Sequence, residues 1–274
     1  MRALPRWAGY ACIALGGLIM LMPFWTMMVY ATHTNDQILS VPPPTWFGDQ
    51  LMVNLADLLE RRPHFWRSLW MSLWIAGSIA ALNLFFCSLA GYAFAMFSFP
   101  GREPLFAFVL ATLLLPAFVS MVPTILLMQA IGWIDQARAL IVPGACGALG
   151  IFMMRQYIQS AIPHELIEAA RLDGCGEFSI YWRVVLPLLG PALGTLGLVT
   201  FIGSYNNFVG ALLVLRDQAH YTVPLVLRSL QGTTGVTVSA LSAGAAVTVL
   251  PLLVLFVLFS RRMIDGLTSG AVKG

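Results

Sequence analysis

Long apolar runs constrain this chain more than any other feature of its sequence. A helix of about 20 apolar residues crosses the hydrocarbon core of a bilayer, and within lipid its backbone polar groups are satisfied inside the segment. The chain has six such runs, which predict an all-α integral membrane protein with six transmembrane helices. They cover residues 8–31, 68–97, 105–129, 139–157, 184–215 and 240–260.

Composition agrees with this class. Hydrophobic residues make up 59% of the chain and charged residues 10%, against roughly 45–50% and about 25% in soluble domains. The net charge of +3 is small and indicates no nucleic-acid partner. The four cysteines form no C-x-x-C pair and no Cys/His cluster, so the sequence predicts neither a disulfide framework nor a metal site.

The first apolar run decides the topology. It follows Arg2 and Arg6 and is longer than the 7–15 residues of a secretory signal core, so we interpret it as an uncleaved span that starts in the cytoplasm. Counting onward places nine of the 15 lysines and arginines on or beside the cytoplasmic side and six outside. Because cytoplasmic loops carry the positive excess, both termini are expected on the cytoplasmic side of the membrane.

The connections divide the chain into two predicted parts. Residues 1–65 hold the first span and an outer loop, with polyproline II expected at 41–44 and a short amphipathic helix at 49–60. Residues 66–274 form the transmembrane core, with a cytoplasmic loop at 158–187 and a cytoplasmic tail at 261–274.

Small and rigid residues mark two of the runs. Pro116 and Pro123 interrupt the third run and predict a kink, which serves either helix packing or a solute path. Gly144, Gly147 and Gly150 recur every three residues and predict close contact with another helix.

Several absences bear on the energy source. No Asp, Glu, Lys or Arg lies in the middle of any run, whereas ion-coupled carriers usually hold such residues in the membrane. The chain also lacks a G-x-x-x-x-G-K-[ST] phosphate loop, and Lys273 is its only lysine. We therefore expect no enzyme activity here and an energy source on another chain. A sodium-coupled secondary carrier remains the alternative.

The longest polar interruption in the second half is residues 165–187, ELIEAARLDGCGEFSIYWRVVLP, with four acids and two arginines. Pro163 suits the first position of a helix, residues 165–172 are good helix formers, and Gly174 supplies the left-handed residue that ends one. Such concentrated charge indicates a loop presented to a partner. The alternative is an amphipathic linker that lies on the membrane.

Two further features of this loop are predicted. Glu168 and Arg171 form an i,i+3 pair, and Ala169 and Ala170 leave a bare patch for the close approach of another protein. A second short helix is expected at 177–183, with aromatic side chains suited to the lipid interface. These are Phe178, Tyr181 and Trp182.

The loop resembles the EAA loop of ABC importer permeases, whose form is EAA-x3-G-x9-I-x-LP. Here Glu168-Ala169-Ala170 precedes Gly174 and Val184-Val185-Leu186-Pro187, with Val184 where isoleucine is usual. Further blocks from about Trp66 onward resemble the carbohydrate-uptake permeases of the maltose MalG type. They are Phe99-Pro100-Gly101-Arg102, Gly150-Ile151-Phe152 with Arg155-Gln156, Ser204-Tyr205-Asn206-Asn207-Phe208 and the ending GLTSGAVKG.

Two positions depart from the family pattern. The family more often has Trp-Asn-Asp or Trp-Asn-Glu where this chain has Tyr205-Asn206-Asn207, and Asn-Ser-Leu where it has Met71-Ser72-Leu73. These changes leave the transport role intact. They bear on the solute, so glycerol phosphate or an amino sugar stays an alternative to a sugar.

The resemblance implies the six-helix fold of type I ABC importer permeases, a place in the bacterial cytoplasmic (inner) membrane and a set of partners. These are a second, related permease, two ATPase subunits and an extracytoplasmic solute-binding lipoprotein or periplasmic protein. ATP and magnesium would bind the ATPase, and this chain would bind no cofactor. In the family, the EAA helix docks into a cleft on the ATPase, and the loop corresponding to residues 216–237 contacts the solute-binding protein.

The resemblance also implies contact residues. Coupling to the ATPase is expected from Glu165, Glu168, Ala169, Ala170, Arg171, Asp173 and Gly174. A second ATPase contact is expected from the tail residues Gly266, Thr268 and Gly270. Polar side chains in the runs are candidates for lining a solute path, with hydrogen bonding between helices as the alternative. They are Asn83, Tyr205, Asn206 and Asn207.

Overall fold

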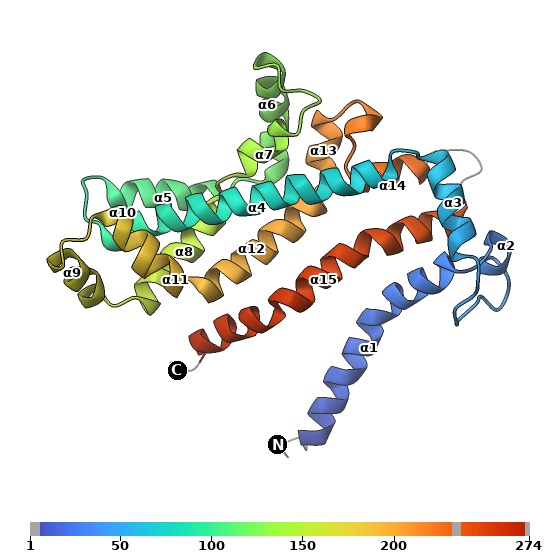
Figure 1. Ribbon diagram of the computed structural model, residues 1–274, viewed down its shortest axis with the longest axis horizontal. Coiled ribbons are helices and arrows are strands. Elements are labelled where there is room, and N and C mark those ends of the chain that lie inside the picture. Colours follow the sequence, from blue (N-terminus) through green and yellow to red (C-terminus); the bar gives the residue numbers. More distant parts are fainter. Residues whose placement is uncertain (1–5, 232–236, 272–274) are drawn as a thin grey trace. The chain divides into compact units, whose positions relative to one another are not determined.

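The structure of the chain is a computed structural model that describes residues 6–231 and 237–271 (Figure 1). All regular secondary structure within these ranges is helical. The chain forms two compact units, each built from two stretches of sequence. Unit 1 comprises Met1–Trp66 and Val226–Pro251, and unit 2 comprises Arg67–Leu225 and Leu252–Gly274. The division by sequence at residues 65 and 66 stays a prediction.

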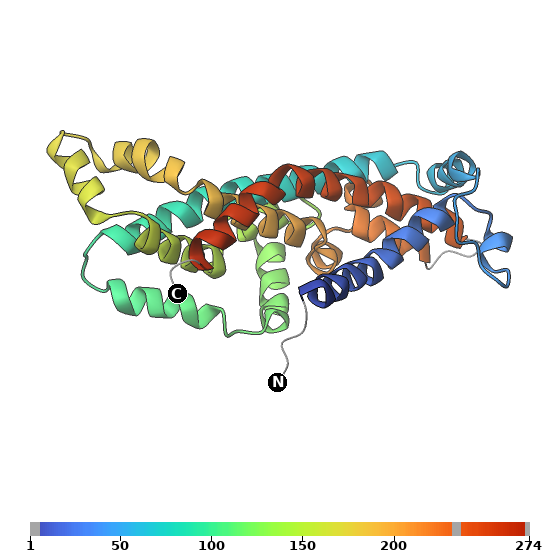
Figure 2. The same ribbon diagram turned by 90° about the horizontal axis from the view of Figure 1, so that it is seen from below.

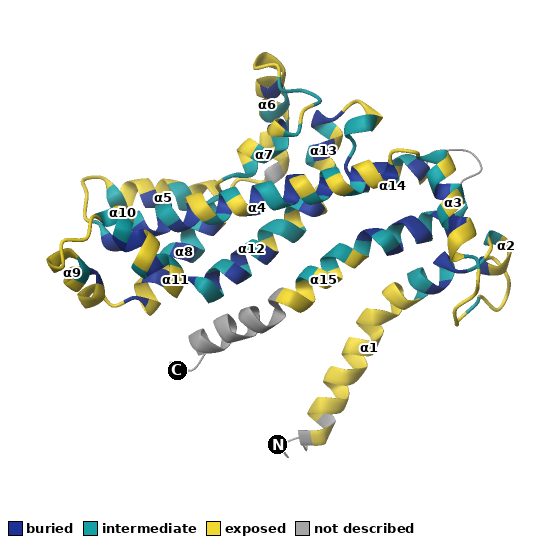
Figure 3. Cartoon of the chain, viewed as in Figure 1, coloured by how far each residue is buried: buried dark blue, intermediate teal, exposed yellow. Residues whose placement is uncertain are grey.

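Unit 1 contains the first apolar helix of the chain and the beginning of the last one. Helix α1 (Arg6–Ala31) packs its last turns against the first turns of α15 (Val238–Ala271), where Ala243 and Ala246 are buried against Ala31. Most of α1 is exposed along its length, as Figure 3 shows. Such a long apolar helix with so little burial is a surface for lipid or for another subunit.

The segment between α1 and α4 (Phe65–Met96) contains two short helices. The amphipathic helix expected at 49–60 is confirmed as α3 (Leu51–Arg61), which buries Leu58. Asn54 ties α3 to the end of α1, because its Nδ2 donates to the carbonyls of Ala31 and His33, both at 2.9 Å. A short helix that the sequence reasoning missed, α2 (Asn35–Ile38), begins with a capping box between Thr34 and Gln37.

Unit 2 is assembled along one long helix, α4 (Phe65–Met96). Helix α14 (Val223–Gln231) follows the last loop of this unit. The elements between them are α5 (Arg102–Thr112), α6 (Ala117–Ala130), α7 (Arg138–Gly144), α8 (Ala148–Ala161), α9 (His164–Leu172), α10 (Glu177–Ile180), the π-helical turn η1 (Tyr181–Val185), α11 (Leu186–Leu188), α12 (Gly190–Tyr205), α13 (Phe208–Val214) and the 3-10 turn η2 (Gln218–His220).

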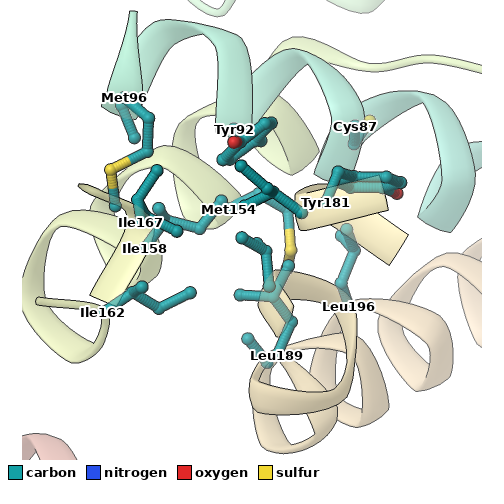
Figure 4. Close-up of a cluster of buried hydrophobic side chains, with 14 residues drawn as sticks. Cys87, Tyr92, Met96, Met154, Ile158, Ile162, Ile167, Tyr181, Leu189 and Leu196 are labelled. Atoms are coloured by element: carbon teal, nitrogen blue, oxygen red, sulfur yellow. The ribbon is translucent and has the colours of Figure 1, made fainter. Parts of the chain in front are cut away.

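The core of unit 2 lies where α4, α8, η1 and α12 meet (Figure 4). Met154 and Ile158 of α8 are fully buried there beside Tyr181 and Leu189. Tyr181 places its hydroxyl 2.8 Å from Ser88 Oγ on α4, which satisfies its polar end inside an apolar cluster. Because lipid is as apolar as these side chains, close van der Waals packing, and not removal from water, is what stabilises such a cluster in a membrane protein.

The number of membrane spans depends on how two bent helix pairs are counted. In the described residues, four helices are long and apolar enough to cross a bilayer, or six if each bent pair is one span. The segments around α5 and α6 meet at 101°, a bend that Figure 2 shows in green, and those around α11 and α12 meet at 80°. Six apolar runs are therefore present, but the third and fifth are not single straight helices.

Proline explains the sharper bend. Pro116 stands just before α6 with an extended ψ of 130°. It has no N–H to offer, so the helix that begins in α5 ends before it and a new one starts. The predicted interruption in the third run is thus a break between two helices, whereas Pro123 lies inside α6 without ending it. The fifth run breaks again between α12 and α13, at Asn206 and Asn207.

The glycine face predicted in the fourth run does pack closely on another helix. A Cβ at Gly150 would lie 2.6 Å from Cys87 Sγ of α4, and one at Gly144 would lie 2.9 Å from Ile79 Cγ2. Farther along the same helix pair, α4 contributes a glycine of its own. A Cβ at Gly91 would lie 2.5 Å from Met154 Cβ and 2.9 Å from the Arg155 backbone nitrogen.

Gly91→Ala is therefore expected to destabilise unit 2, because a methyl group would meet the backbone of α8. Overpacking of this kind typically costs about 1–3 kcal/mol. The measurement is the thermal unfolding midpoint of the purified, detergent-solubilised protein. Gly77→Ala is the matched control, since it changes the same helix where a Cβ would meet no atom within 4 Å. Equal midpoints for the two variants would contradict this account of the α4–α8 contact.

Candidate functional site

Helix α9 carries the residues that the sequence singles out for coupling, and Figure 1 shows it at one end of unit 2. Pro163 precedes its first residue, one position earlier than predicted. The end of the helix is as predicted: Gly174 has φ +79°, its N–H donates to the Arg171 carbonyl at 3.0 Å, and the Cys175 N–H donates to the Ala170 carbonyl at 3.1 Å. This pair of bonds is the Schellman arrangement that ends a helix on glycine.

One side of α9 is anchored to the core. Ile167 is buried among Ile158, Ile162 and Tyr181, and Ala170 is half-buried against the same cluster. The bare patch predicted from two alanines is therefore wrong in one respect, because Ala170 packs inward. A helix of nine residues is marginal alone, so this anchor fixes its position.

The other side of α9 is exposed and mixes acids with apolar atoms. Glu165, Glu168, Ala169 and Asp173 are all exposed there. The sequence reasoning missed Leu172, which is 89% exposed in the last turn of the helix. The exposure of Leu172 could have been predicted from its spacing. It lies five residues after Ile167, which places it on a different face of a helix with 3.6 residues per turn.

Arg171 is held by a different acid from the one predicted. Its Nε lies 2.7 Å from Glu177 Oε1 at the start of α10, and the Tyr92 hydroxyl of α4 donates to Glu177 Oε2 at 3.1 Å. The expected pairing with Glu168 is replaced because the turn at Gly174 brings α10 back beside α9. The ion pair is about 40% exposed and so is worth about 1 kcal/mol or less, yet it joins α9, α10 and α4.

The aromatic residues after α9 divide between the core and the surface. Tyr181 is 1% exposed, which corrects its expected place at the lipid interface: the π-helical turn directs it to Ser88. Phe178 and Trp182 are exposed and stack with ring centroids 6.3 Å apart. Their predicted place at the lipid interface stays a prediction.

Other motif residues hold α5 against α8. Gly101 has φ +83° and directly precedes α5. Arg102, the first residue of α5, donates to the Phe97 carbonyl at 3.1 Å. The Arg155 guanidinium of α8 lies 4.0 Å from the centroid of the Phe106 ring, an attractive cation–π contact. These two motifs thus act in the packing of unit 2.

The four polar residues proposed for a solute path have different surroundings. Asn83 is buried in α4, and its Nδ2 donates to the Gly144 carbonyl at 3.2 Å. Its Oδ1 accepts from Thr200 Oγ1 at 3.5 Å. Tyr205 is buried and stacks on Phe201. Both fit the alternative of contacts between and within helices better than a path lining.

The two asparagines after Tyr205 lie at the break between α12 and α13. Asn206 directly follows α12, and its Nδ2 donates to the Ile202 carbonyl at 3.0 Å. Asn207 directly precedes α13, and its Oδ1 accepts from the Gly210 N–H at 2.9 Å. Asn207 also lines a cavity of about 290 Å³ between α6, α7 and α13.

The tail residues proposed as a second ATPase contact are placed in part. Gly266, Thr268 and Gly270 belong to α15, which continues to Ala271. Their side-chain surroundings lie outside the described part of the chain, as does the rest of the tail after residue 271. This contact stays a prediction.

Sequence reasoning also missed a polar cluster around Asp135, in the loop between α6 and α7. Asp135 has φ +63°, a left-handed conformation that aspartate tolerates better than most residues. Its Oδ1 accepts from the backbone N–H groups of Arg216 and Asp217 at 2.9 and 3.0 Å. Its Oδ2 lies 3.0 Å from His220 Nδ1, and its own N–H donates to the Val214 carbonyl at 2.8 Å.

This cluster joins two loops that are distant in sequence. Partial burial raises the pKa of Asp135, but the hydrogen bonds from the Arg216 and Asp217 backbone and from His220 outweigh it and hold that pKa below its ordinary value. The carboxylate therefore stays charged throughout the neutral range. It fixes the start of the segment 216–237, for which the family resemblance predicts contact with a solute-binding protein.

Asp135→Ala is expected to release this segment. Removing the carboxylate leaves the Arg216 and Asp217 N–H groups without their acceptor, and local opening becomes easier. Amide hydrogen exchange at Arg216 and Asp217 should speed up by about tenfold, the factor that follows from losing roughly 1.4 kcal/mol. Asp135→Asn is the matched control, since asparagine keeps an acceptor oxygen and tolerates positive φ. Unchanged exchange in the alanine variant would contradict the role of the cluster.

Comparison with known proteins gives consistent results. The family model described as "Binding-protein-dependent transport system inner membrane component" matches residues 83–265. An arabinooligosaccharide transport system permease protein, AraQ of Halalkalibacterium halodurans, is 38% identical over 210 residues, which cover 77% of this chain and 75% of that protein. The lactose transport system permease protein LacG of Rhizobium radiobacter is 30% identical over 99% of this chain and 98% of its own length.

A solved structure shares the fold. A chain of a bacterial ABC transporter involved in the import of the acidic polysaccharide alginate superposes with a TM-score of 0.81 at 21% identity, covering 93% of this chain and 96% of that one. The family model covers the α9 loop, the break at Asn207 and most of α15. The chain is therefore a member of the family of binding-protein-dependent transport system inner membrane components.

Proposed function

We propose that this chain is the permease subunit of an ATP-driven, binding-protein-dependent importer of a sugar or sugar-like solute. The observation that carries the proposal is α9, a short helix anchored to the core of unit 2 through Ile167 with its acidic side exposed. Its sequence fits the EAA pattern, and relatives are permeases named for arabinooligosaccharides and lactose.

The contacts of α9 suggest how movement of an ATPase would reach the solute path. Ile167 packs against the cluster that contains Tyr181 and Leu189, which lead directly into α12. Arg171 connects through Glu177 to Tyr92 of α4. A displacement of α9 would therefore be passed to α4 and α12 together, because close-packed contacts of this kind transmit strain.

The transport cycle follows as alternating access. ATP would bind the partner ATPase with magnesium and close its dimer, moving the docked α9 helices and turning the permeases outward. Solute delivered by the external binding protein would enter between this chain and a second, related permease. Hydrolysis would reset the ATPase and release the solute inward. In this account the chain has six spans, both termini are cytoplasmic and it binds no nucleotide itself.

Two alternatives are less well supported. An importer of glycerol phosphate or an amino sugar would use the same architecture, so the fold does not separate it from the proposal. A sodium-coupled carrier would need neither an ATPase nor a binding protein. Membership of a binding-protein-dependent family favours the ATP-driven importer over it.

Glu168→Arg should detach the ATPase while leaving the permease in the membrane. Glu168 is on the exposed side of α9, so reversing its charge disrupts the proposed docking face without disturbing the core. The measurement is co-purification from membranes through a tag on this chain. The wild type should retain both a second permease and an ATPase, and the variant should lose the ATPase alone.

Glu60→Arg provides the matched control, because Glu60 is exposed on α3 in the outer loop of unit 1. It should retain all subunits. Recovery of the tagged chain alone from wild-type membranes would favour the secondary carrier. Retention of the ATPase by the Glu168 variant would exclude this residue from the docking face.

Gly174→Pro should abolish uptake without preventing membrane insertion. Proline holds φ near −65°, whereas Gly174 has φ +79°, so the turn after α9 cannot form. The measurement is ATP-dependent uptake at matched protein levels in the membrane. Gly176→Pro is the control, because Gly176 has φ −72° and accepts proline. Normal uptake by the Gly174 variant would show that the helix end is not needed for coupling.

A further inference from the structure

The cavity beside Asn207 lies where several helices of unit 2 are interrupted. Asn207 itself stands at the α12–α13 break, Gly144 at the end of α7, and Ser120 in the first turn of α6, after the α5–α6 bend. Discontinuous helices bring backbone and polar groups to solute sites in many transporters. Helices α7 and α13, which contribute residues to the cavity wall, lie away from α9 in Figure 1.

The polar atoms around this cavity are neutral. Among the described residues that line it are the hydroxyls of Ser120, Thr124 and Ser204 and the amide of Asn207, with no Asp, Glu, Lys or Arg. Thr124 Oγ1 donates to the Ser120 carbonyl at 2.7 Å, so its oxygen can still accept a hydrogen bond. The remaining walls are apolar, including Ile79 and Leu213.

The Asn207 amide is fixed in one orientation. Its Oδ1 accepts from the Gly210 N–H at 2.9 Å, so Nδ2 is the donor that it offers to other groups. A Cβ at residue 210 would lie 2.7 Å from Asn207 Nδ2 and 2.9 Å from Oδ1. Glycine at 210 is therefore what lets the amide lie across the start of α13.

We propose that this cavity is a subsite for an uncharged, hydroxyl-bearing part of the solute, such as one sugar ring. Sugar hydroxyls both donate and accept, which matches hydroxyls combined with one fixed amide donor. A phosphate or carboxylate buried here would find no cation to offset its desolvation. Asn207 is a binding residue in this subsite and Gly210 is a positioning residue that acts through it. The inference rests on the proposed importer function and narrows its solute class.

The size of the cavity is consistent with a partial site. Its volume of about 290 Å³ lies at the lower end of the roughly 300–1,000 Å³ typical of small-molecule sites. It can therefore hold only part of an oligosaccharide. A larger cavity of about 340 Å³ near Leu84 and Gly197 is lined by apolar side chains and glycines in the described residues, and so offers a sugar no side-chain hydrogen bond.

The test is uptake by the whole complex in proteoliposomes, with its binding protein and ATP. The probes are radiolabelled lactose, arabinotriose and glycerol 3-phosphate. Asn207→Asp keeps the cap of α13 but replaces the amide donor with a charge. Gly210→Ala displaces the amide while favouring the helix. For the sugar that the wild type imports, both variants should raise KM about tenfold, as the loss of one hydrogen bond predicts.

Two controls separate binding from coupling. Gly203→Ala should leave KM unchanged, because a Cβ there meets no atom within 4 Å. ATP hydrolysis stimulated by the binding protein should continue in all variants at high sugar concentration. Unchanged KM in both Asn207→Asp and Gly210→Ala would overturn the subsite while leaving the importer function in place. So would import of glycerol 3-phosphate alone by the wild type.

A second measurement covers the case in which these variants fail to assemble. Ser204→Cys introduces a thiol at the cavity, and its reaction with a hydrophilic methanethiosulfonate is compared with that of the parent complex. Protection of this thiol by the imported sugar supports the subsite, and equal labelling with and without sugar overturns it. Absence of any ATP-dependent uptake or binding-protein-stimulated hydrolysis in the wild type would instead overturn the importer function itself.

Discussion

The structure of unit 2 depends on how it satisfies backbone groups where helices break within the apolar runs. Each break exposes N–H or carbonyl groups that the bilayer cannot hydrogen-bond. The chain answers with short amide side chains: Asn83 donates to the Gly144 carbonyl, Asn206 to that of Ile202, and Asn207 accepts from the Gly210 N–H. These asparagines hydrogen-bond backbone groups at or beside the interruptions, and Asn207 also lines the cavity.

Asn83 and Asn207 therefore have different roles. Asn83 is buried and donates to the Gly144 carbonyl at the end of a neighbouring helix. Asn207 instead accepts from an N–H of the helix that it precedes, and its Nδ2 donor remains at the cavity. Both were equivalent candidates by sequence, since each is an amide within an apolar run. The two roles are distinguished only by the folded structure, in which Asn83 Nδ2 is bonded to the Gly144 carbonyl while Asn207 is bonded to Gly210 through Oδ1 alone.

Sequence therefore predicts this protein unevenly. The turn at Gly174 and the amphipathic helix α3 are local features, set by composition and backbone preference, and they are present as expected. The apolar runs are helical, but the third and fifth are bent or broken. The pairing of Arg171 with Glu177, the burial of Tyr181 and the Asp135 cluster depend on segments brought together by folding. Asp135 and His220 are 85 residues apart, so no local pattern could have joined them.

The two candidate sites are connected by one rigid element. Helix α12 follows Leu189, which is buried in the cluster that anchors α9, and it ends at Tyr205, two residues before Asn207. Its 16 residues span about 24 Å at 1.5 Å per residue. A helix transmits axial displacement along its length because its backbone hydrogen bonds resist compression, so a shift at the α9 cluster would reach the α12–α13 break. The Asn206 and Asn207 hydrogen bonds at that break would then have to persist in both conformations of the permease.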